Sequence, residues 1–289
     1  MRVGVLGAAL TVLALALAAT ATGGPATATA IPGCAIADLN LLKPGTLTVG
    51  TDNPAYPPWF GGAERKPWKV SNPYSGKGYE SAVAYAVAKE LGFPRGKVTW
   101  TAVPFASSFR PGKKPFDFYL AQVSYKPERA KNVTFSNAYY FVNQSVVANA
   151  GTPIASVKTV AGLKRYKLGA QVGTTSYDYI VKYIRPSQKP AVYDTNNDAI
   201  SALRSKQIDG IVVDLPTAFY VVAVQLENGT IVGRLPNRGP ERERFGMVFE
   251  KDNPLVRCVN KALNRLWANG TIKRLQQQYL ARAGAPDLR

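Results

Sequence analysis

Histidine is absent from this chain of 289 residues, and cysteine occurs twice. Without histidine the chain has no Ser-His-Asp or Cys-His catalysis and no histidine-ligated metal site, and two cysteines do not by themselves form a cysteine-rich one. Histidine is also the commonest general base. The composition therefore predicts a protein that is not an enzyme and that uses neither a metal nor another cofactor.

The N-terminus predicts export from the cell. Residues 1–2 form a short positive region, residues 3–19 are an almost unbroken apolar run, and residues 28–30 fit a small-x-small cleavage site. Residues 1–30 are therefore predicted to be a signal peptide, and the mature protein to be secreted, either periplasmic or at the cell surface. A retained transmembrane anchor is the alternative, but the segment lacks a basic stop-transfer flank.

The two cysteines, Cys34 and Cys258, admit two interpretations. An even count in an exported chain favours a disulfide, which would close a very long loop and add on the order of 5 kcal/mol in the chain-entropy model. The alternative is a lipid anchor through Cys34, because residues 31–34 resemble a weak lipobox. The apolar run ends well before Cys34, and lipidation would leave Cys258 unpaired, so the disulfide is favoured.

The formal net charge of +18 raises the question of a polyanionic partner. Lysine and arginine are scattered along the whole mature chain, without a long basic run or a recognisable motif for reading nucleic acid. We therefore expect a basic surface beside an anionic cell envelope, and no nucleic-acid partner.

Short apolar strands alternate with amphipathic helices along the mature chain, which predicts an α/β fold with parallel sheets. A first strand at 47–50 runs into a loop rich in proline and aromatic residues, 52–60. A helix at 80–91 has one apolar face and is stopped by Gly92. Further strands are expected at 98–103, 116–123 and within 135–148.

A second unit of the same kind follows. A strand at 167–172 turns into a helix for which Thr175 is the expected cap, and Asn196 or Asn197 is expected to cap the next helix. Residues 208–213 form a continuous apolar run, which is typical of a strand buried on both faces. A loop-like stretch precedes a strand at 245–249 and two C-terminal helices.

Pairing of Cys34 with Cys258 would bring the last helices beside the start of the chain, so that the first and last segments share a lobe. The predicted division is residues 31–145 for the first part of lobe 1 and 146–236 for lobe 2. Residues 237–289 are then the hinge return and the C-terminal part of lobe 1. Connecting strands near 143–148 and 236–245 would form the hinge.

Seven stretches, in order, resemble the family 3 periplasmic-type binding proteins for amino acids. The resemblance covers nearly the whole mature chain and implies a type II periplasmic-binding-protein-like fold. In that fold two α/β lobes are joined by two hinge strands and close on a ligand between them. The stretches are LTVGTDNPAYPPW at 47–59, GYESAVAYAVAKELG at 78–92, Phe116-Asp117, SYKPERAKNVTFSNAYY at 124–140, VGTT at 172–175, IDGIVVD at 208–214, and the tail from Asn253.

The resemblance assigns a clamp for the α-groups of an amino acid. Arg129 matches the arginine that holds the ligand carboxylate, for which a planar, permanently charged guanidinium is suited. Thr174 and Thr175 match a turn whose hydroxyl and N–H groups meet the same carboxylate. Asp214 matches the acid that takes the ammonium group, and it follows a buried strand, where open α/β sheets place ligands.

The resemblance also implies the rest of the binding site. Tyr56 matches the aromatic residue that covers the aliphatic part of the ligand, and Trp59 is expected to line the same wall. Ser124 and the backbone around Gln122 match the segment that contacts the amino and carboxyl groups. Gln122 stands where many relatives carry a small residue. With Asp52 and Glu80 nearby, the local groups favour a polar or cationic ligand side chain.

These residues predict a monomeric extracellular binding protein. An amino-acid zwitterion would favour the closed state by contacting both lobes, and the closed form would dock on the membrane permease of an ABC importer. The sequence does not determine which amino acid is bound. One alternative is a periplasmic dehydratase of the prephenate or arogenate type on the same fold, with Glu80 or Asp52 as general acid. Another is a basic secreted protein that binds polyanions.

Overall fold

The structure is a computed structural model that describes Met1, residues 30–281 and residues 284–289. The predicted signal peptide, apart from its two end residues, lies outside the described residues. Within them, no helix is both long enough and apolar enough to cross a membrane.

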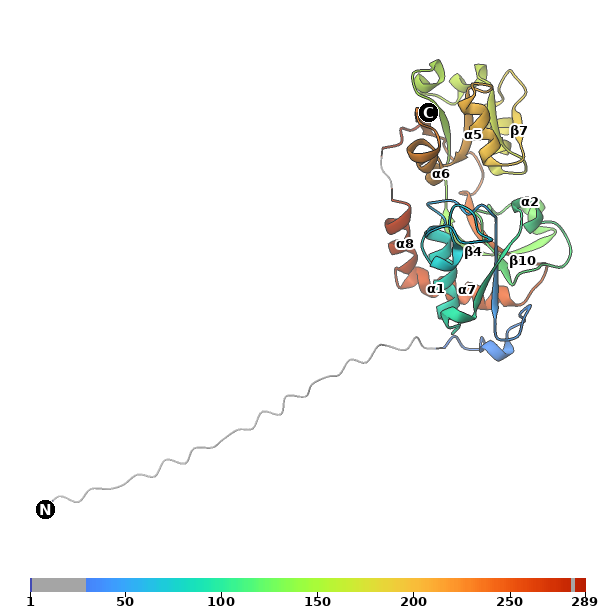
Figure 1. Cartoon of the computed structure of the whole chain (residues 1–289), viewed down its shortest axis with the longest axis vertical. Helices are drawn as coiled ribbons and strands as arrows, with labels where there is room; N and C mark the ends of the chain where they lie inside the picture. Colours follow the sequence, from blue (N-terminus) through green and yellow to red (C-terminus); the bar gives the residue numbers. More distant parts are fainter. Residues whose placement is uncertain (2–29, 282–283) are drawn as a thin grey trace.

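The chain forms two α/β lobes, each built on a mixed five-stranded sheet (Figure 1). The predicted fold class is confirmed. In the first sheet the strand order is β2-β1-β3-β10-β4, and in the second it is β7-β6-β8-β5-β9. The strands of the first sheet are β1 (Leu47–Thr51), β2 (Val98–Ala102), β3 (Phe118–Tyr119), β4 (Val133–Phe141) and β10 (Arg244–Glu250). Those of the second are β5 (Gln144–Asn149), β6 (Leu168–Gln171), β7 (Ala191–Tyr193), β8 (Gly210–Asp214) and β9 (Gly229–Arg234).

Helices cover the sheets of both lobes. The first lobe has α1 (Tyr79–Glu90), α2 (Phe105–Ser108), α3 (Pro127–Ala130), α7 (Leu255–Ala268) and α8 (Thr271–Tyr279). The second has α4 (Thr175–Tyr179), α5 (Asn196–Arg204) and α6 (Leu215–Tyr220), of which α4 and α6 each continue as a π-helical turn. The apolar stripe of α7 is buried, as its spacing predicts, and β1 is buried along its whole length.

Two described segments connect a strand of one lobe to a strand of the other. Residues 142–143 connect β4 to β5, and residues 235–243 connect β9 to β10. Each crossing delivers an antiparallel strand into the middle of the next sheet, because β5 pairs antiparallel with β8, and β10 pairs antiparallel with β3. The polar residues on these crossings therefore lie between the lobes.

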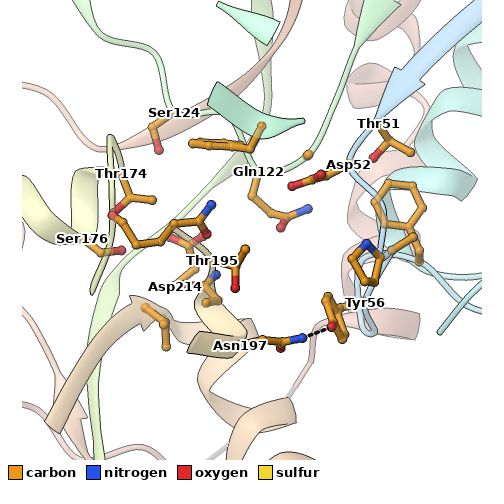
Figure 2. A pocket seen from close by; sticks show the side chains of 18 of the residues that line it. Thr51, Asp52, Tyr56, Gln122, Ser124, Thr174, Ser176, Thr195, Asn197 and Asp214 are labelled. Atoms are coloured by element: carbon orange, nitrogen blue, oxygen red, sulfur yellow. Dashed lines mark hydrogen bonds between the residues drawn. The ribbon is translucent and has the colours of Figure 1, made fainter. Parts of the chain in front are cut away.

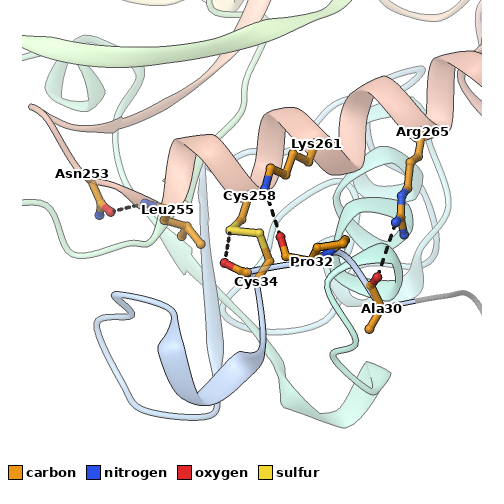
Figure 3. The surroundings of a disulfide bond; sticks show 9 residues. Ala30, Pro32, Cys34, Asn253, Leu255, Cys258, Lys261 and Arg265 are labelled. Atoms are coloured by element: carbon orange, nitrogen blue, oxygen red, sulfur yellow. Dashed lines mark hydrogen bonds between the residues drawn. A yellow bond between two sulfur atoms is a disulfide. The ribbon is translucent and has the colours of Figure 1, made fainter.

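Cys34 and Cys258 form a disulfide with a Cα–Cα distance of 5.7 Å, so the disulfide prediction is confirmed. It joins the N-terminal segment to α7 (Figure 3). Lys261 of α7 also donates to the Pro32 carbonyl at 3.0 Å. Because the Cys34 sulfur is bonded to Cys258, it has no free valence for the thioether of a lipid anchor.

The last residues lie against the second lobe, whereas the whole of 237–289 after the hinge was expected in the first. Leu288 is 3% exposed within the second-lobe core, and its N–H donates to the Arg234 carbonyl at 2.9 Å. Asp287 forms a parallel bridge and an ion pair with Arg234. The physical reason is that β9 is an edge strand with unpaired backbone groups, which this short tail satisfies.

Candidate functional site: a charged cavity between the lobes

A cavity of about 180 Å³ lies between the lobes (Figure 2). Its walls come from segments that follow the carboxyl ends of β1, β3, β6, β7 and β8, where open α/β sheets place ligands. Eight of the predicted site residues line it: Asp52, Tyr56, Gln122, Ser124, Arg129, Thr174, Thr175 and Asp214. Among the described residues, no group of His, Cys, Asp and Glu is arranged to hold a metal ion.

Arg129 is held rigidly in the cavity wall. One Nη donates to the Ser124 carbonyl at 2.6 Å and the other donates to the Gly173 carbonyl of the second lobe at 2.7 Å. The guanidinium also lies over the Phe109 ring, 4.4 Å from its centroid. Burial lowers the pKa of Arg129 to about 10, which still leaves it charged at neutral pH. Arg129 therefore presents a fixed positive charge with further N–H donors to spare.

The turn before α4 presents hydroxyl groups to the cavity. The helix cap is Thr174, whose side chain accepts from the Tyr177 N–H at 3.2 Å, and not Thr175 as the sequence suggested. Thr174 has the extended backbone of a cap, whereas Thr175 is the first helical residue. The Thr175 hydroxyl is consequently free to bond elsewhere, and it donates to Glu243 at 2.6 Å.

Asp214 is the N-cap residue of α6, yet its side chain makes no capping bond and lines the cavity instead. Gln144 Nε2 donates to its carboxylate at 2.7 Å. Burial raises the pKa of Asp214 well above its usual range, and the nearby charge of Glu243 raises it further. A cation bound in the cavity would relieve this unfavourable environment by pairing with the ionised carboxylate.

Glu243, which the sequence reasoning missed, does not line the cavity itself but holds residues of its wall. It lies on the second crossing segment and accepts from Ser124 Oγ and Thr175 Oγ1, each at 2.6 Å. Gln144, next to the first crossing, donates to it at 3.1 Å. The Glu243 carboxylate thus bonds to residues of both lobes and links the second crossing segment to the end of the first. The available sequence signal was an acidic residue in the loop-like stretch 233–244.

Asp52 and Gln122 form the first-lobe side of the cavity. Burial raises the pKa of Asp52, against the opposing effect of N–H groups of Asn53 and Phe105. Next to it, Thr51 Oγ1 is buried and has no hydrogen-bond partner within the described part of the chain. Glu80 lies behind this wall, with no exposed surface, and bonds to Gln122.

The two predicted aromatic residues have different positions. Tyr56 lines the cavity, and its hydroxyl accepts from Asn197 Nδ2 across the lobes (Figure 2). Trp59 is 2% exposed and does not line the cavity, contrary to expectation. It packs within the first-lobe core, 5.6 Å between ring centroids from Phe245, because that aromatic cluster removes more of its surface from water. Its Nε1 donates to Thr217 Oγ1 of the second lobe at 3.0 Å.

Two similar lobes that face each other across a charged cavity define a two-lobed ligand-binding protein. Residues 47–282 match the model of the bacterial extracellular solute-binding proteins, family 3, and the chain belongs to that family. The solute-binding function predicted from the sequence is thereby confirmed at the level of the family.

Several relatives have names that specify a ligand. The chain is 29% identical over 204 residues to ABC transporter arginine-binding protein 1 of Escherichia coli (strain K12), covering 70% of this chain and 81% of that protein. It is 26% identical over 221 residues to the arginine-binding extracellular protein ArtP of Bacillus subtilis (strain 168), covering 75% and 83%. An ancestral arginine-binding protein bound to arginine matches in structure with a TM-score of 0.65 at 29% identity, covering 82% and 99%.

Proposed function

We propose that this protein captures a free amino acid with a cationic side chain in the cavity and delivers it to an ABC importer. One observation carries the proposal: the guanidinium of Arg129 and the carboxyl group of Asp214 line the same cavity between the lobes. A zwitterion has one group for each of them, and a ligand that contacts both lobes stabilises their closed arrangement by differential affinity.

The α-groups of the ligand are assigned to this charged pair. The carboxylate would bind Arg129 and the hydroxyl and N–H groups of Thr174 and Thr175, while the ammonium would bind Asp214. Ser124 would contact the same end of the ligand. Tyr56, whose ring forms part of the wall, would cover the aliphatic part.

The remaining polar groups support a positively charged side chain. After Arg129 and Asp214 are matched by the two α-groups, no described residue supplies a cation for the carboxyl group of Asp52 or a hydrogen-bond partner for the Thr51 hydroxyl. An arginine-like side chain supplies both a positive charge and several N–H donors. Relatives named as arginine-binding proteins point the same way.

Delivery to an importer is inferred from the names of relatives, which include components of ABC transporters. The partner would be the membrane permease, which would receive the closed form of a monomeric binding protein. The dehydratase alternative has less support. Glu80, one of its two candidate acids, is fully buried and is held by three hydrogen bonds behind the cavity wall.

A thermal-shift screen of the twenty amino acids on the purified protein tests the proposal, followed by calorimetry on any ligand found. A ligand at a hundred times its Kd should add about 2.7 kcal/mol to the free energy of unfolding. We expect arginine or lysine to give the largest shift, and Arg129→Ala to remove it. Absence of a shift with every amino acid, from protein freed of bound ligand by unfolding and refolding, would contradict the proposal.

A further inference from the structure

Gln122 lines the cavity in a backbone conformation that its side chain does not favour. Its φ of 54° lies in the left-handed region, which residues other than glycine rarely adopt. Such a conformation persists only where the surroundings hold it in place. The question is therefore which contact holds Gln122, and what its side chain gains from being held there.

Glu80 holds both ends of this residue. Glu80 Oε1 accepts from the Gln122 backbone N–H at 2.7 Å, and Glu80 Oε2 accepts from Gln122 Nε2. The Tyr139 hydroxyl donates to Oε1 as well. Glu80 has no exposed surface and is absent from the lining of the cavity, so it acts on the cavity through Gln122.

The bond from Nε2 determines which amide atom of Gln122 is left for the cavity. An ionised carboxylate is an acceptor only, so the NH₂ group must face Glu80 and Oε1 must face elsewhere. No described residue donates to Gln122 Oε1, and the side chain reaches into the cavity beside Asp52 (Figure 2). The amide therefore supplies a carbonyl acceptor next to a carboxylate.

We propose that Glu80 is a positioning residue for ligand specificity: it fixes Gln122 so that the cavity presents an acceptor, which selects ligand side chains that donate hydrogen bonds. This inference rests on the proposed function and extends it to the choice among amino acids. L-Arginine and L-citrulline are suitable probes. They have nearly the same shape, but citrulline has a neutral urea group with its own carbonyl.

The decisive variant is Glu80→Gln. The new amide keeps the size of Glu80 but has one NH₂ group where Oε2 was, so Gln122 must rotate its amide and turn Nε2 toward the cavity. We expect the ratio of arginine affinity to citrulline affinity, measured by calorimetry, to fall at least tenfold. An unchanged ratio in a folded Glu80→Gln protein would overturn the proposal.

Asp117→Asn is the matched control. Asp117 is also a buried first-lobe carboxylate, 1% exposed, and it accepts from the N–H groups of Leu42 and Thr48, each at 2.6 Å. This variant should lower the melting temperature and leave the affinity ratio as in the wild type. An equal change of the ratio in both variants would show general loosening of the lobe and would overturn the positioning role.

Gln122→Met provides a test that does not depend on the folding of Glu80→Gln. It removes the amide at similar length, and the affinity ratio should fall by about the same factor. In the double variant the two losses should not add, because both act through the same amide. A wild-type ratio in Gln122→Met overturns this inference alone, whereas a wild-type protein that binds neither probe overturns the proposed function as well.

Discussion

The two lobes share one strand order but are completed by different ends of the chain. In each, the second strand of the sheet (β1 or β6) has a parallel strand on either side, and an antiparallel strand arriving from the other lobe comes next. In the first lobe, a disulfide fastens the N-terminal segment to α7. In the second lobe, the C-terminal tail packs against the sheet, and Leu288 is part of the core.

The lobes also differ in the charge that they present to the cavity. The first supplies the cation Arg129 together with the carboxyl group of Asp52, and the second supplies Asp214. Arg129 lies in α3, after β3, whereas Asp214 ends β8, the corresponding strand of the second sheet, so corresponding parts of the two lobes carry different chemistry. A ligand whose carboxylate binds Arg129 and whose ammonium binds Asp214 contacts both lobes, which would link its binding to their closure.

Removing the first-lobe charge should have the largest effect. Arg129→Ala leaves the ligand carboxylate without its ionic partner, and truncating such a buried pair costs at least about 2–5 kcal/mol, or some 30- to 5,000-fold in Kd. Calorimetry with arginine measures the loss. Arg129→Lys is the control and should bind with intermediate affinity, because it keeps the charge without the bidentate geometry. Wild-type affinity in Arg129→Ala would remove this residue from the ligand clamp.

Removing the disulfide should separate the stabilities of the two lobes. Replacing Cys34 and Cys258 together by serine should lower the free energy of unfolding by about 2–5 kcal/mol. All four tryptophans, Trp59, Trp68, Trp100 and Trp267, belong to the first-lobe core, so their fluorescence reports that lobe alone. We expect the fluorescence transition in urea to move to a lower concentration than the circular-dichroism transition, which follows both lobes.

Leu288→Ala is the matched change in the second lobe. Deleting a buried leucine side chain typically costs about 2–5 kcal/mol. Here the circular-dichroism transition should move to a lower urea concentration, and the fluorescence transition should move little or not at all. Identical shifts of the two probes in both variants would mean that the lobes unfold as one unit.

Glu80 should make the stability of the fold and the affinity for arginine depend on pH in opposite directions. Burial raises the pKa of Glu80 to about 7 from 4.5, so the folded state binds more protons than the unfolded state between these values. Stability from this group is therefore complete below pH 4.5 and is lost as the pH rises through 7, by on the order of 3 kcal/mol. The groups that face Glu80 are Tyr79, Tyr119, Tyr139 and Asp214.

Arginine affinity should change in the opposite sense, because the ionised form of Glu80 orients Gln122. As the pH falls through 7, affinity should decrease in the wild type more steeply than in Glu80→Gln. Calorimetry at several pH values measures the difference between the two proteins. Parallel pH profiles would show that Glu80 does not contribute to the pH dependence of binding.

Loosening the contact between the lobes at Trp59 should have the smallest effect. Trp59→Phe removes the hydrogen bond to Thr217, worth about 1 kcal/mol, or about fivefold in ligand affinity. Trp267→Phe is the control, because its Nε1 donates within the first lobe, to the Ala138 carbonyl at 2.8 Å. It should lower the melting temperature and leave affinity unchanged. Equal affinities of the two variants would assign Trp59 to the core alone.

Local features of the sequence determined the alternation of strands and helices and favoured the disulfide, and the resemblance to the family assigned eight residues that line the cavity. Strands buried on both faces read as continuous apolar runs, and the residues that follow them meet at one edge of a sheet. Arg129 and Asp214 were assigned to one site because their segments resemble those of the family, and the structure places both in the same cavity. The helix caps were less certain: α5 is capped by Thr195 rather than by Asn196 or Asn197, a shift of one or two residues.

Contacts between distant segments were decided by the tertiary structure. Glu243 meets Ser124 from 119 residues away, Leu288 closes the second lobe, Trp59 turns into the core, and Glu80 holds Gln122 in a left-handed conformation. None of these follows from periodicity or residue type, because each depends on which surfaces the folded chain brings together. The sequence alone thus determined the kind of site, and the packing of the two lobes determined which side chains shape it.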